Sequence, residues 1–373
     1  MEAAVENTGR RNWTWYLVPG FIFQSVTIAG GYGTGAEIAQ YFGVYGLAGG
    51  LMGLAVTLVV WSVICAVAFK FARMFKTYDY GSMMEKLLGP ASVLYDICYY
   101  VMMLIVMGVI NATAGSMIHS LTGISPWIGV FLLSAGVVLL VLKGTVAIEK
   151  VLSFWSYVLY AVYILFMIVV FTRYGSTVSA ELAKGQAEAG WLSGGLRYSF
   201  YNLVVVPMVL YTVRDTRSSG EAAFCGAIAG VIGVIPAVFL LLTMGCSLAQ
   251  VTAAETPVTV IFSMINMKWL YVLFEIVLFG TLIETGTGFI KAVADRVENG
   301  MARRGHKTGF AFHAGLTIFM TVVGVCISSF GLTGLIAKGY GTACWGFLFL
   351  FAIPMVTVGV WKMVRAEKSG AAE

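Results

Sequence analysis

Four glycines crowd into one apolar segment near the start of the chain, beside polar side chains that a plain apolar helix would not need. The segment reads Ala29-Gly30-Gly31-Tyr32-Gly33-Thr34-Gly35-Ala36-Glu37. Glycine costs about 1 kcal/mol relative to alanine inside a helix, so a cluster this dense predicts local unwinding. Unwound backbone offers carbonyls to a cation and amides to an anionic group, and this combination favours a binding site. The binding residues predicted from this segment are Gly30, Gly31, Tyr32, Gly33, Thr34, Gly35 and Glu37.

Close helix packing is the alternative role for the same glycines. Gly31 and Gly35 are four residues apart, and small residues at this spacing let two helices approach each other closely. Packing alone does not require the polar side chains of Tyr32, Thr34 and Glu37. Their presence favours the binding site.

A second polar interruption lies in residues 191–213, where Ser199, Tyr201 and Asn202 precede Pro207. A proline inside a helix removes one backbone hydrogen bond and strains the preceding turn, so we predict a break within residues 200–207. A kink in a helix that binds nothing is the alternative. Interrupted helices at matching positions of two halves indicate a transporter with its site between the halves, so we assign Ser199, Tyr201 and Asn202 to the same substrate site.

The elements that must position these residues are membrane spans. Of the 373 residues, 59% are hydrophobic and 11% are charged, against roughly 25% charged in a soluble domain. A run of about 20 apolar residues crosses the hydrocarbon core of a bilayer. We therefore predict an all-α integral membrane protein that is one domain over residues 1–373, without a removable signal peptide. The predicted spans are 14–42, 45–72, 91–119, 124–142, 150–172, 191–213, 220–247, 268–296, 308–330 and 340–363.

A polar loop at residues 173–190 divides the spans into two sets of five, at about 14–172 and 191–363. Because each set has an odd number of spans, the second set is inverted relative to the first, which predicts a 5+5 inverted repeat. Residues 251–267 are predicted to form an interfacial helix outside the membrane.

The basic residues predict the orientation of the chain. With ten spans, eighteen Lys and Arg residues fall on the side that holds both termini, and five fall on the other side. Because basic residues favour the cytoplasmic side, we predict a multi-pass protein of the cell (inner) membrane with both termini in the cytoplasm.

The 5+5 arrangement with broken first and sixth spans resembles the LeuT-type fold of the amino acid, polyamine and organocation transporter superfamily. The stretch GGYGTGAEIAQYFG, and RYSFYN in the sixth span, are most similar to YkvI-type membrane proteins, one branch of that fold. The resemblance covers nearly the whole chain. It implies alternating access, in which the first and sixth spans rock against a scaffold and a sodium ion or a proton drives transport.

The eighth predicted span has a polar face. Thr281 and Thr285 lie on one helical face, and Glu284 lies on the adjacent stripe. The resemblance implies that this span faces the first one and helps to ligate a cation, so we assign Thr281, Glu284 and Thr285 to the coupling ion. The carbonyl of Ala29 in the predicted unwound segment is assigned to the same ion.

Other roles stay open for these carboxylates. Oxygen ligands suit a hard cation, but a buried Glu37 or Glu284 could carry a proton instead. Glu275 is a weaker candidate for ion coupling. A purely structural ion pair between Glu284 and Lys291 is a further alternative.

Asn111 is the polar residue of the third span that we assign to the substrate site. A hydrogen bond between helices is the alternative, because such bonds are common among polar residues in membrane helices.

The chain lacks the GxSxG, HExxH and GxxxxGK[ST] patterns, which argues against hydrolytic or ATP-driven chemistry. We therefore expect no enzyme activity, no catalytic residue, no metal site and no cofactor other than a coupling sodium ion or proton. The expected partners are the lipid bilayer and a small polar solute, for which we predict an amino acid or related amine taken up by symport. The net charge of +5 needs no nucleic-acid partner to explain it. A sensor or channel that keeps the transporter fold is the competing function, and the oligomeric state is open.

Overall fold

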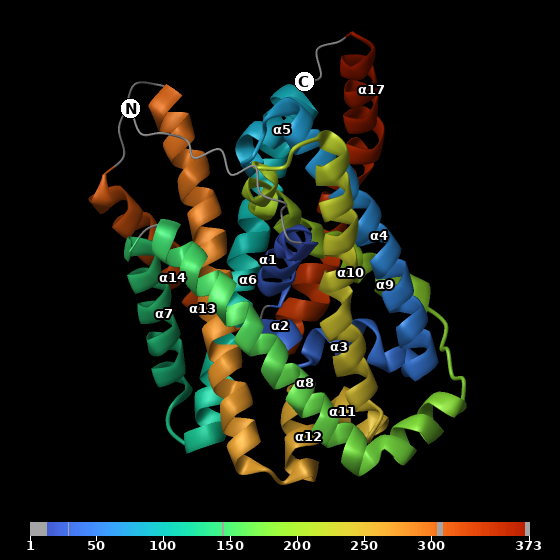
Figure 1. Cartoon of the computed structure of the whole chain (residues 1–373). Helices are drawn as coiled ribbons and strands as arrows, with labels where there is room; N and C mark the ends of the chain where they lie inside the picture. The colour runs from blue at the N-terminus through green and yellow to red at the C-terminus, as the bar shows by residue number, and fades with distance from the viewer. Residues whose placement is uncertain (1–12, 29, 144, 304–308, 370–373) are drawn as a thin grey trace.

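The computed structural model describes residues 13–28, 30–143, 145–303 and 309–369, and within them the chain is almost entirely helical. Nine helices of this part are long and apolar enough to cross a membrane (Figure 1). They match the second to the tenth predicted spans, and a first span made of short pieces completes the predicted ten. The all-α membrane architecture is thus confirmed.

The first half begins with a broken span and continues with long helices. A 3-10 turn, η1 (Trp13–Leu17), leads into the three short helices α1 (Val18–Thr27), α2 (Gly30–Gly33) and α3 (Ala36–Tyr41). The remaining helices are α4 (Gly46–Phe75), the short α5 (Tyr80–Leu88), α6 (Ser92–Thr122), α7 (Pro126–Lys143) and α8 (Thr145–Ala183).

The second half starts with α9 (Trp191–Asn202), which continues as the 3-10 helix η4 (Leu203–Val213). Next come α10 (Ser219–Met244), the short α11 (Leu248–Ala253) and α12 (Pro257–Ile265), α13 (Lys268–Arg303) and α14 (Phe310–Ser328). The last span combines α15 (Leu332–Gly334), α16 (Gly341–Phe347) and α17 (Val360–Lys368) with the π-helical turns η5 (Leu335–Tyr340), η6 (Leu348–Ala352) and η7 (Met355–Gly359).

Two predicted connections differ from the structure. Helix α8 extends through Ala183, so only residues 184–190 of the predicted polar loop at 173–190 lie outside a helix. Polar residues can form a helix that is exposed to water, so polarity alone does not mark the end of a helix. For this reason the loop was predicted to begin too early. The single interfacial helix predicted at residues 251–267 is two helices, α11 and α12, because Pro257 starts a new helix at its first position.

Glycines bring helices of the two halves together. A Cβ atom at Gly226 of α10 would lie 2.3 Å from the carbonyl oxygen of Cys65 on α4, and one at Gly230 would lie 2.3 Å from the backbone nitrogen of Ser62. The backbones of α4 and α10 therefore touch, and this GxxxG pattern serves packing within one chain. Gly195 of α9 likewise packs on the backbone of α4.

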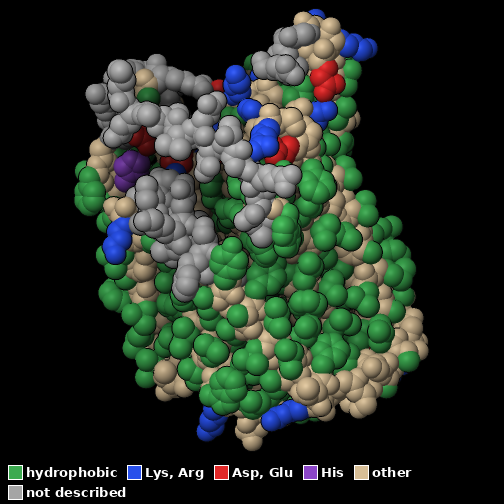
Figure 2. Space-filling view, viewed as in Figure 1, with side chains coloured by type: hydrophobic (Ala, Val, Ile, Leu, Met, Phe, Trp, Pro, Cys, Tyr) green, Lys and Arg blue, Asp and Glu red, His purple; other side chains and the backbone are tan. Residues whose placement is uncertain are grey.

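The surface is arranged as a bilayer requires. Figure 2 shows hydrophobic side chains over the middle of one face, with most charged side chains gathered at the end where α17 lies. Helices α5 and α17 lie at this end, and α11 and α12 lie at the opposite end (Figure 1). The first end carries the basic residues predicted to face the cytoplasm, and we call it the inner end; the other is the outer end.

Candidate functional site

The first span is broken where its glycines predicted. Helix α1 ends at Thr27, α2 is a single turn, and α3 starts after Gly35, whose φ of +83° is a conformation that favours glycine. The glycines also pack closely, since a Cβ at Gly30 would lie 2.7 Å from Thr113 Oγ1 and one at Gly33 would lie 1.8 Å from Leu278 Cδ1. Unwinding and close packing therefore occur together in this segment.

The sixth span changes its helix type where a break was predicted. The α-helical part ends at Asn202, and a 3-10 helix with Pro207 inside runs to Val213. A 3-10 stretch of this length is uncommon, because its hydrogen bonds have poorer geometry than those of an α-helix. The chain continues without a gap, so the predicted break is a change of helix geometry.

Glu37 connects the two broken spans. Its side chain, on α3, is 1% exposed, and it accepts a hydrogen bond from the hydroxyl of Tyr201 on α9. The backbone N–H of Tyr32 also donates to this carboxyl group. The ring of Tyr201 stacks on Tyr340 of the last span, with ring centroids 4.7 Å apart. We call Glu37, Tyr201 and Tyr340 the central junction.

A small cavity lies against the central junction. It encloses about 20 Å³, which is enough for one water molecule or a small ion. Two residues predicted for the substrate site besides Glu37, namely Tyr201 and Asn202, line it. Sequence reasoning missed Tyr340, because no pattern in the last span distinguishes that residue from the other aromatic residues. The full lining consists of Val26, Thr27, Glu37, Met102, Val106, Tyr201, Asn202, Val204, Val205, Phe289 and Tyr340.

Several predicted site residues lie outside this cavity and make hydrogen bonds within their own helices. Ser199 Oγ donates to the Gly195 carbonyl at 2.6 Å, and Asn111 Nδ2 donates to the Met107 carbonyl at 2.7 Å. Thr34 Oγ1 donates to the Gly30 carbonyl at 3.0 Å. Such bonds satisfy these donors locally, so the structure does not bring the three side chains to the central junction.

The eighth span meets the first span at Glu284. Ser25 Oγ of α1 donates to Glu284 Oε2 at 3.1 Å, and Glu284 is 1% exposed. Thr285 Oγ1 and Glu284 Oε1 have no hydrogen-bond partner among the described residues, whereas Thr281 Oγ1 donates to the Val277 carbonyl at 3.0 Å. Ala29, assigned to the same ion, lies outside the described residues. Sequence reasoning missed Ser25.

The alternative of an ion pair between Glu284 and Lys291 is wrong. Lys291 Nζ lies 2.6 Å from Asp295 Oδ2, one turn further along α13. Lys291 lines a cavity at the inner end, whereas Glu284 is buried against α1. The two side chains therefore lie in different surroundings, although they lie on one stripe of the helix.

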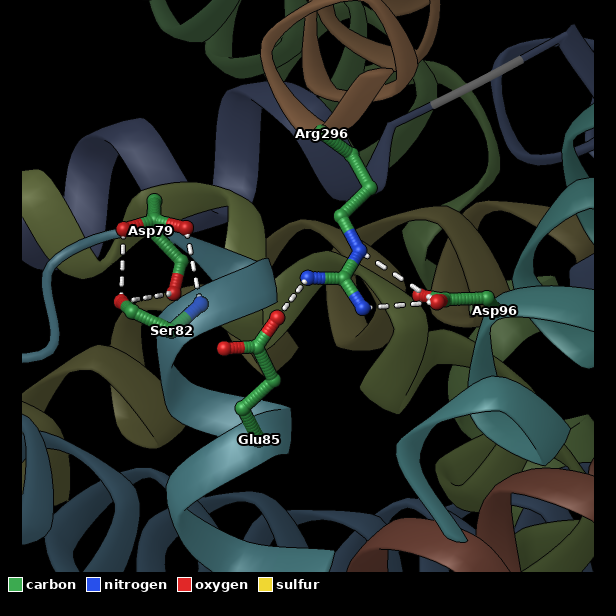
Figure 3. A network of polar contacts seen from close by, with 5 residues as sticks. All are labelled: Asp79, Ser82, Glu85, Asp96 and Arg296. Carbon is green, nitrogen blue, oxygen red and sulfur yellow. Dashed lines mark hydrogen bonds and ion pairs between the residues drawn. The ribbon is translucent and has the colours of Figure 1, made fainter. Parts of the chain in front are cut away.

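A larger cavity, which we call the vestibule, opens at the inner end. It encloses about 440 Å³, and Val26 lines both the vestibule and the small central cavity. Two basic residues on its wall, Lys291 and Arg296, form ion pairs. Figure 3 shows Arg296 of α13 between two carboxylates, Glu85 of α5 at 2.6 Å and Asp96 of α6 at 2.8 Å. The same view shows Ser82 at the Asp79 cap of α5, where the Ser82 backbone nitrogen donates to Asp79 Oδ1 at 2.9 Å.

A third cavity lies at the outer end and encloses about 680 Å³. Its walls come from α3, the following turn, and the segment between α11 and α12. It shares no lining residue with the vestibule or the central cavity.

Comparison with known proteins identifies the fold. No protein-family model matches the chain, and no curated protein matches it in sequence. One similar solved structure is a Na⁺-coupled sialic acid symporter in a substrate-bound outward-open state. Its sequence is 12% identical to this one, its TM-score is 0.65, and the alignment covers 93% of this chain and 79% of the symporter chain. MhsT in complex with L-phenylalanine is 15% identical with a TM-score of 0.62, covering 94% of this chain and 97% of its own.

A further match is Mhp1, a nucleobase-cation-symport-1 family transporter, in a closed conformation with bromovinylhydantoin bound. It is 14% identical with a TM-score of 0.57, covering 91% of this chain and 76% of its own. At these identities the likeness concerns the fold alone. The chain is an all-α membrane protein of the LeuT-type fold.

Proposed function

We propose that this protein is a secondary active transporter that moves a small polar solute by alternating access. The observation that carries the proposal is the hydrogen bond between Glu37 and Tyr201, which joins the breaks of the first and sixth spans beside a buried cavity. Interrupted helices that meet at a buried polar site are the usual arrangement of transporter binding sites. Two of the similar solved structures are named as a symporter and a transporter, which agrees with this reading.

The proposed substrate is an amino acid or a related small polar amine. Glu37 supplies a carboxyl group, and the rings of Tyr201, Tyr340 and Phe289 surround the same cavity. A carboxylate and aromatic faces both attract an ammonium group in a dry site. The resemblance to YkvI-type proteins belongs to the same proposal.

The proposed coupling ion is sodium or a proton, held where α1 meets α13. Ser25, Glu284 and Thr285 provide oxygen atoms there, two of them without a partner among the described residues. Oxygen ligands suit a hard cation, and a carboxyl group can carry a proton instead. The protein would therefore work as a symporter.

The proposed transport cycle uses the chain as a single domain with two inverted repeats, at about 14–172 and 191–363. Both termini would face the cytoplasm of the cell (inner) membrane, so the vestibule would open to the cytoplasm. Val26, shared by the vestibule and the central cavity, would then form the inner boundary of the substrate site.

Uptake into proteoliposomes tests this function. Purified protein is reconstituted, and labelled amino acids and amines are offered under an inward sodium gradient, an inward proton gradient or neither. We expect accumulation of at least one solute with one of the gradients, and at least a tenfold loss in Glu37→Gln because that change removes the buried charge. Lys184→Gln, a change at an exposed loop residue, serves as the matched control.

The sensor or channel alternative gives a different result. A sensor would bind a solute without accumulating it under any gradient, and a channel would only equilibrate it. Either outcome, with correctly folded and reconstituted protein, would overturn the transporter proposal.

A further inference from the structure

A buried carboxylate outside the central junction has the Tyr271 hydroxyl beside it and no basic partner among the described residues. Glu275 lies seven residues from the outer end of α13 and is 4% exposed. Its Oε2 atom makes no hydrogen bond among the described residues. A charged side chain inside the membrane needs compensation by an opposite charge or by hydrogen-bond donors. Tyr271 is a neutral donor, so the negative charge of this carboxylate is not balanced by any residue that lines its pocket.

Glu275 lines a small space of about 10 Å³ between the first span, α6, α12 and α13. This volume is close to that of a single water molecule or a small ion. None of the residues that line it is basic. Six neighbours on its wall carry hydroxyl groups, namely Thr34, Ser116, Ser120, Thr256, Thr259 and Tyr271.

The oxygen atoms that line this space favour one class of ligand. Carboxylate and hydroxyl oxygens are hard ligands, which suit alkali and alkaline-earth cations. Calcium and magnesium sites generally use several carboxylates or retain several waters, and a space of this size with one carboxylate does not provide that. A monovalent cation balances the single negative charge of Glu275.

We propose that this space, which we call the Glu275 pocket, is a sodium-binding site separate from the coupling-ion site at Glu284. The pocket joins parts of the chain that have to move relative to one another in alternating access. The backbone N–H of Val258 on α12 donates to the carbonyl of Thr34 at 3.0 Å, so α12 is attached to the broken first span. Sodium in the pocket holds α12 and the first span against α13 and α6 at the outer end.

Equilibrium binding of radioactive sodium to the purified, detergent-solubilised protein tests this site without any transport substrate. The variants are Glu275→Gln, which removes the charge and keeps the shape, and Glu284→Gln, which alters the coupling-ion site. Glu255→Gln is the matched control, because Glu255 is an exposed carboxylate of the same outer segment and lines a different cavity. Thr259→Val, which replaces one wall hydroxyl by a methyl group, is the second probe of the pocket.

We expect Glu275→Gln to lose one bound sodium per chain and Glu255→Gln to lose none. Thr259→Val should weaken sodium binding about tenfold through the lost oxygen ligand, and this variant keeps the test decisive if Glu275→Gln fails to fold. Sodium should also raise the melting temperature of the wild type, on the order of 3 °C, and raise that of Glu275→Gln by less.

Three results would contradict the proposal of a sodium site in the Glu275 pocket. They are the absence of sodium binding to the wild type, unchanged sodium binding in Glu275→Gln or Thr259→Val, and stabilisation that depends on pH but not on sodium. If only Glu284→Gln lost sodium, the Glu275 pocket would be refuted while the proposed transport function stood. If only Glu275→Gln lost it, the pocket would stand even if no solute were transported.

Discussion

Charged side chains have different kinds of partner in the central junction and at the vestibule. In the vestibule, Arg296 lies between Glu85 and Asp96, so each charge already has a partner of opposite sign. In the central junction, Glu37 is held by neutral donors from Tyr201 and the Tyr32 backbone. Paired charges stabilise a fixed arrangement, whereas a carboxylate held only by neutral donors remains able to attract a cationic group. The difference agrees with our proposal that the junction binds the substrate, and it predicts that the Arg296 cluster contributes mainly to stability.

The largest effect is expected at the vestibule. Arg296→Ala leaves Glu85 and Asp96 without their shared partner, and breaking a buried pair costs about 3 to 5 kcal/mol. Because the three side chains are 15%, 33% and 13% exposed, we expect the lower end, about 3 kcal/mol of unfolding free energy. Chemical unfolding in detergent measures it. Lys184→Ala, which breaks the exposed pair with Glu181, should change stability by less than about 1 kcal/mol; equal losses would contradict the comparison.

The next effect is expected at the junction. Tyr201→Phe removes a donor from a buried carboxylate, and a hydrogen bond to a charged group is worth about 2 kcal/mol. Tyr340→Phe is the matched control, because the Tyr340 hydroxyl has no hydrogen-bond partner among the described residues. We expect Tyr201→Phe to lower the unfolding free energy by about that amount and Tyr340→Phe to leave it nearly unchanged. A similar loss in both variants would show that Glu37 does not depend on Tyr201.

A smaller effect concerns the stacked rings of the junction. Tyr201 and Tyr340 are parallel within 25°, with centroids 4.7 Å apart, and such pairs contribute about 1 kcal/mol beyond their buried area. A double-mutant cycle with Tyr201→Leu and Tyr340→Leu measures the coupling energy directly. A coupling near zero would mean that the last span is not joined to the junction through these rings.

The smallest effect is expected for Lys291 on the vestibule wall. Its pair with Asp295 is partly exposed, at 27% and 44% of the two side chains, so Lys291→Gln should lower stability by less than about 0.5 kcal/mol. Raising the salt concentration should remove even this difference, because salt screens exposed charges. Stability measured at low and high salt checks both points. A loss as large as that of Arg296→Ala would mean that the vestibule charges act as one network.

Patterns along the chain were sufficient for the spans, for the break in the first span and for the place where the sixth span changes its helix geometry. Apolar length predicted the membrane helices because the thickness of a bilayer sets how many residues must cross it. The glycine cluster before Glu37 and the polar run before Pro207 predicted the breaks because they oppose helix formation locally. Both features depend on residues that are neighbours in the sequence, so no knowledge of the fold was needed. The same patterns singled out Tyr201 and Asn202, which line the small central cavity.

Only the tertiary structure decided which side chains meet. Helical periodicity placed Glu284 and Lys291 on one stripe of α13. In the structure, Glu284 accepts a hydrogen bond from Ser25 where α1 packs against α13, whereas Lys291 pairs with Asp295. Tyr340 joined the junction through a contact between spans far apart in sequence. The sequence by itself determined where helices run and where they break, because backbone propensity and membrane thickness act locally. Which residues share a site depends on how helices pack across the chain, and only the folded structure carries that information.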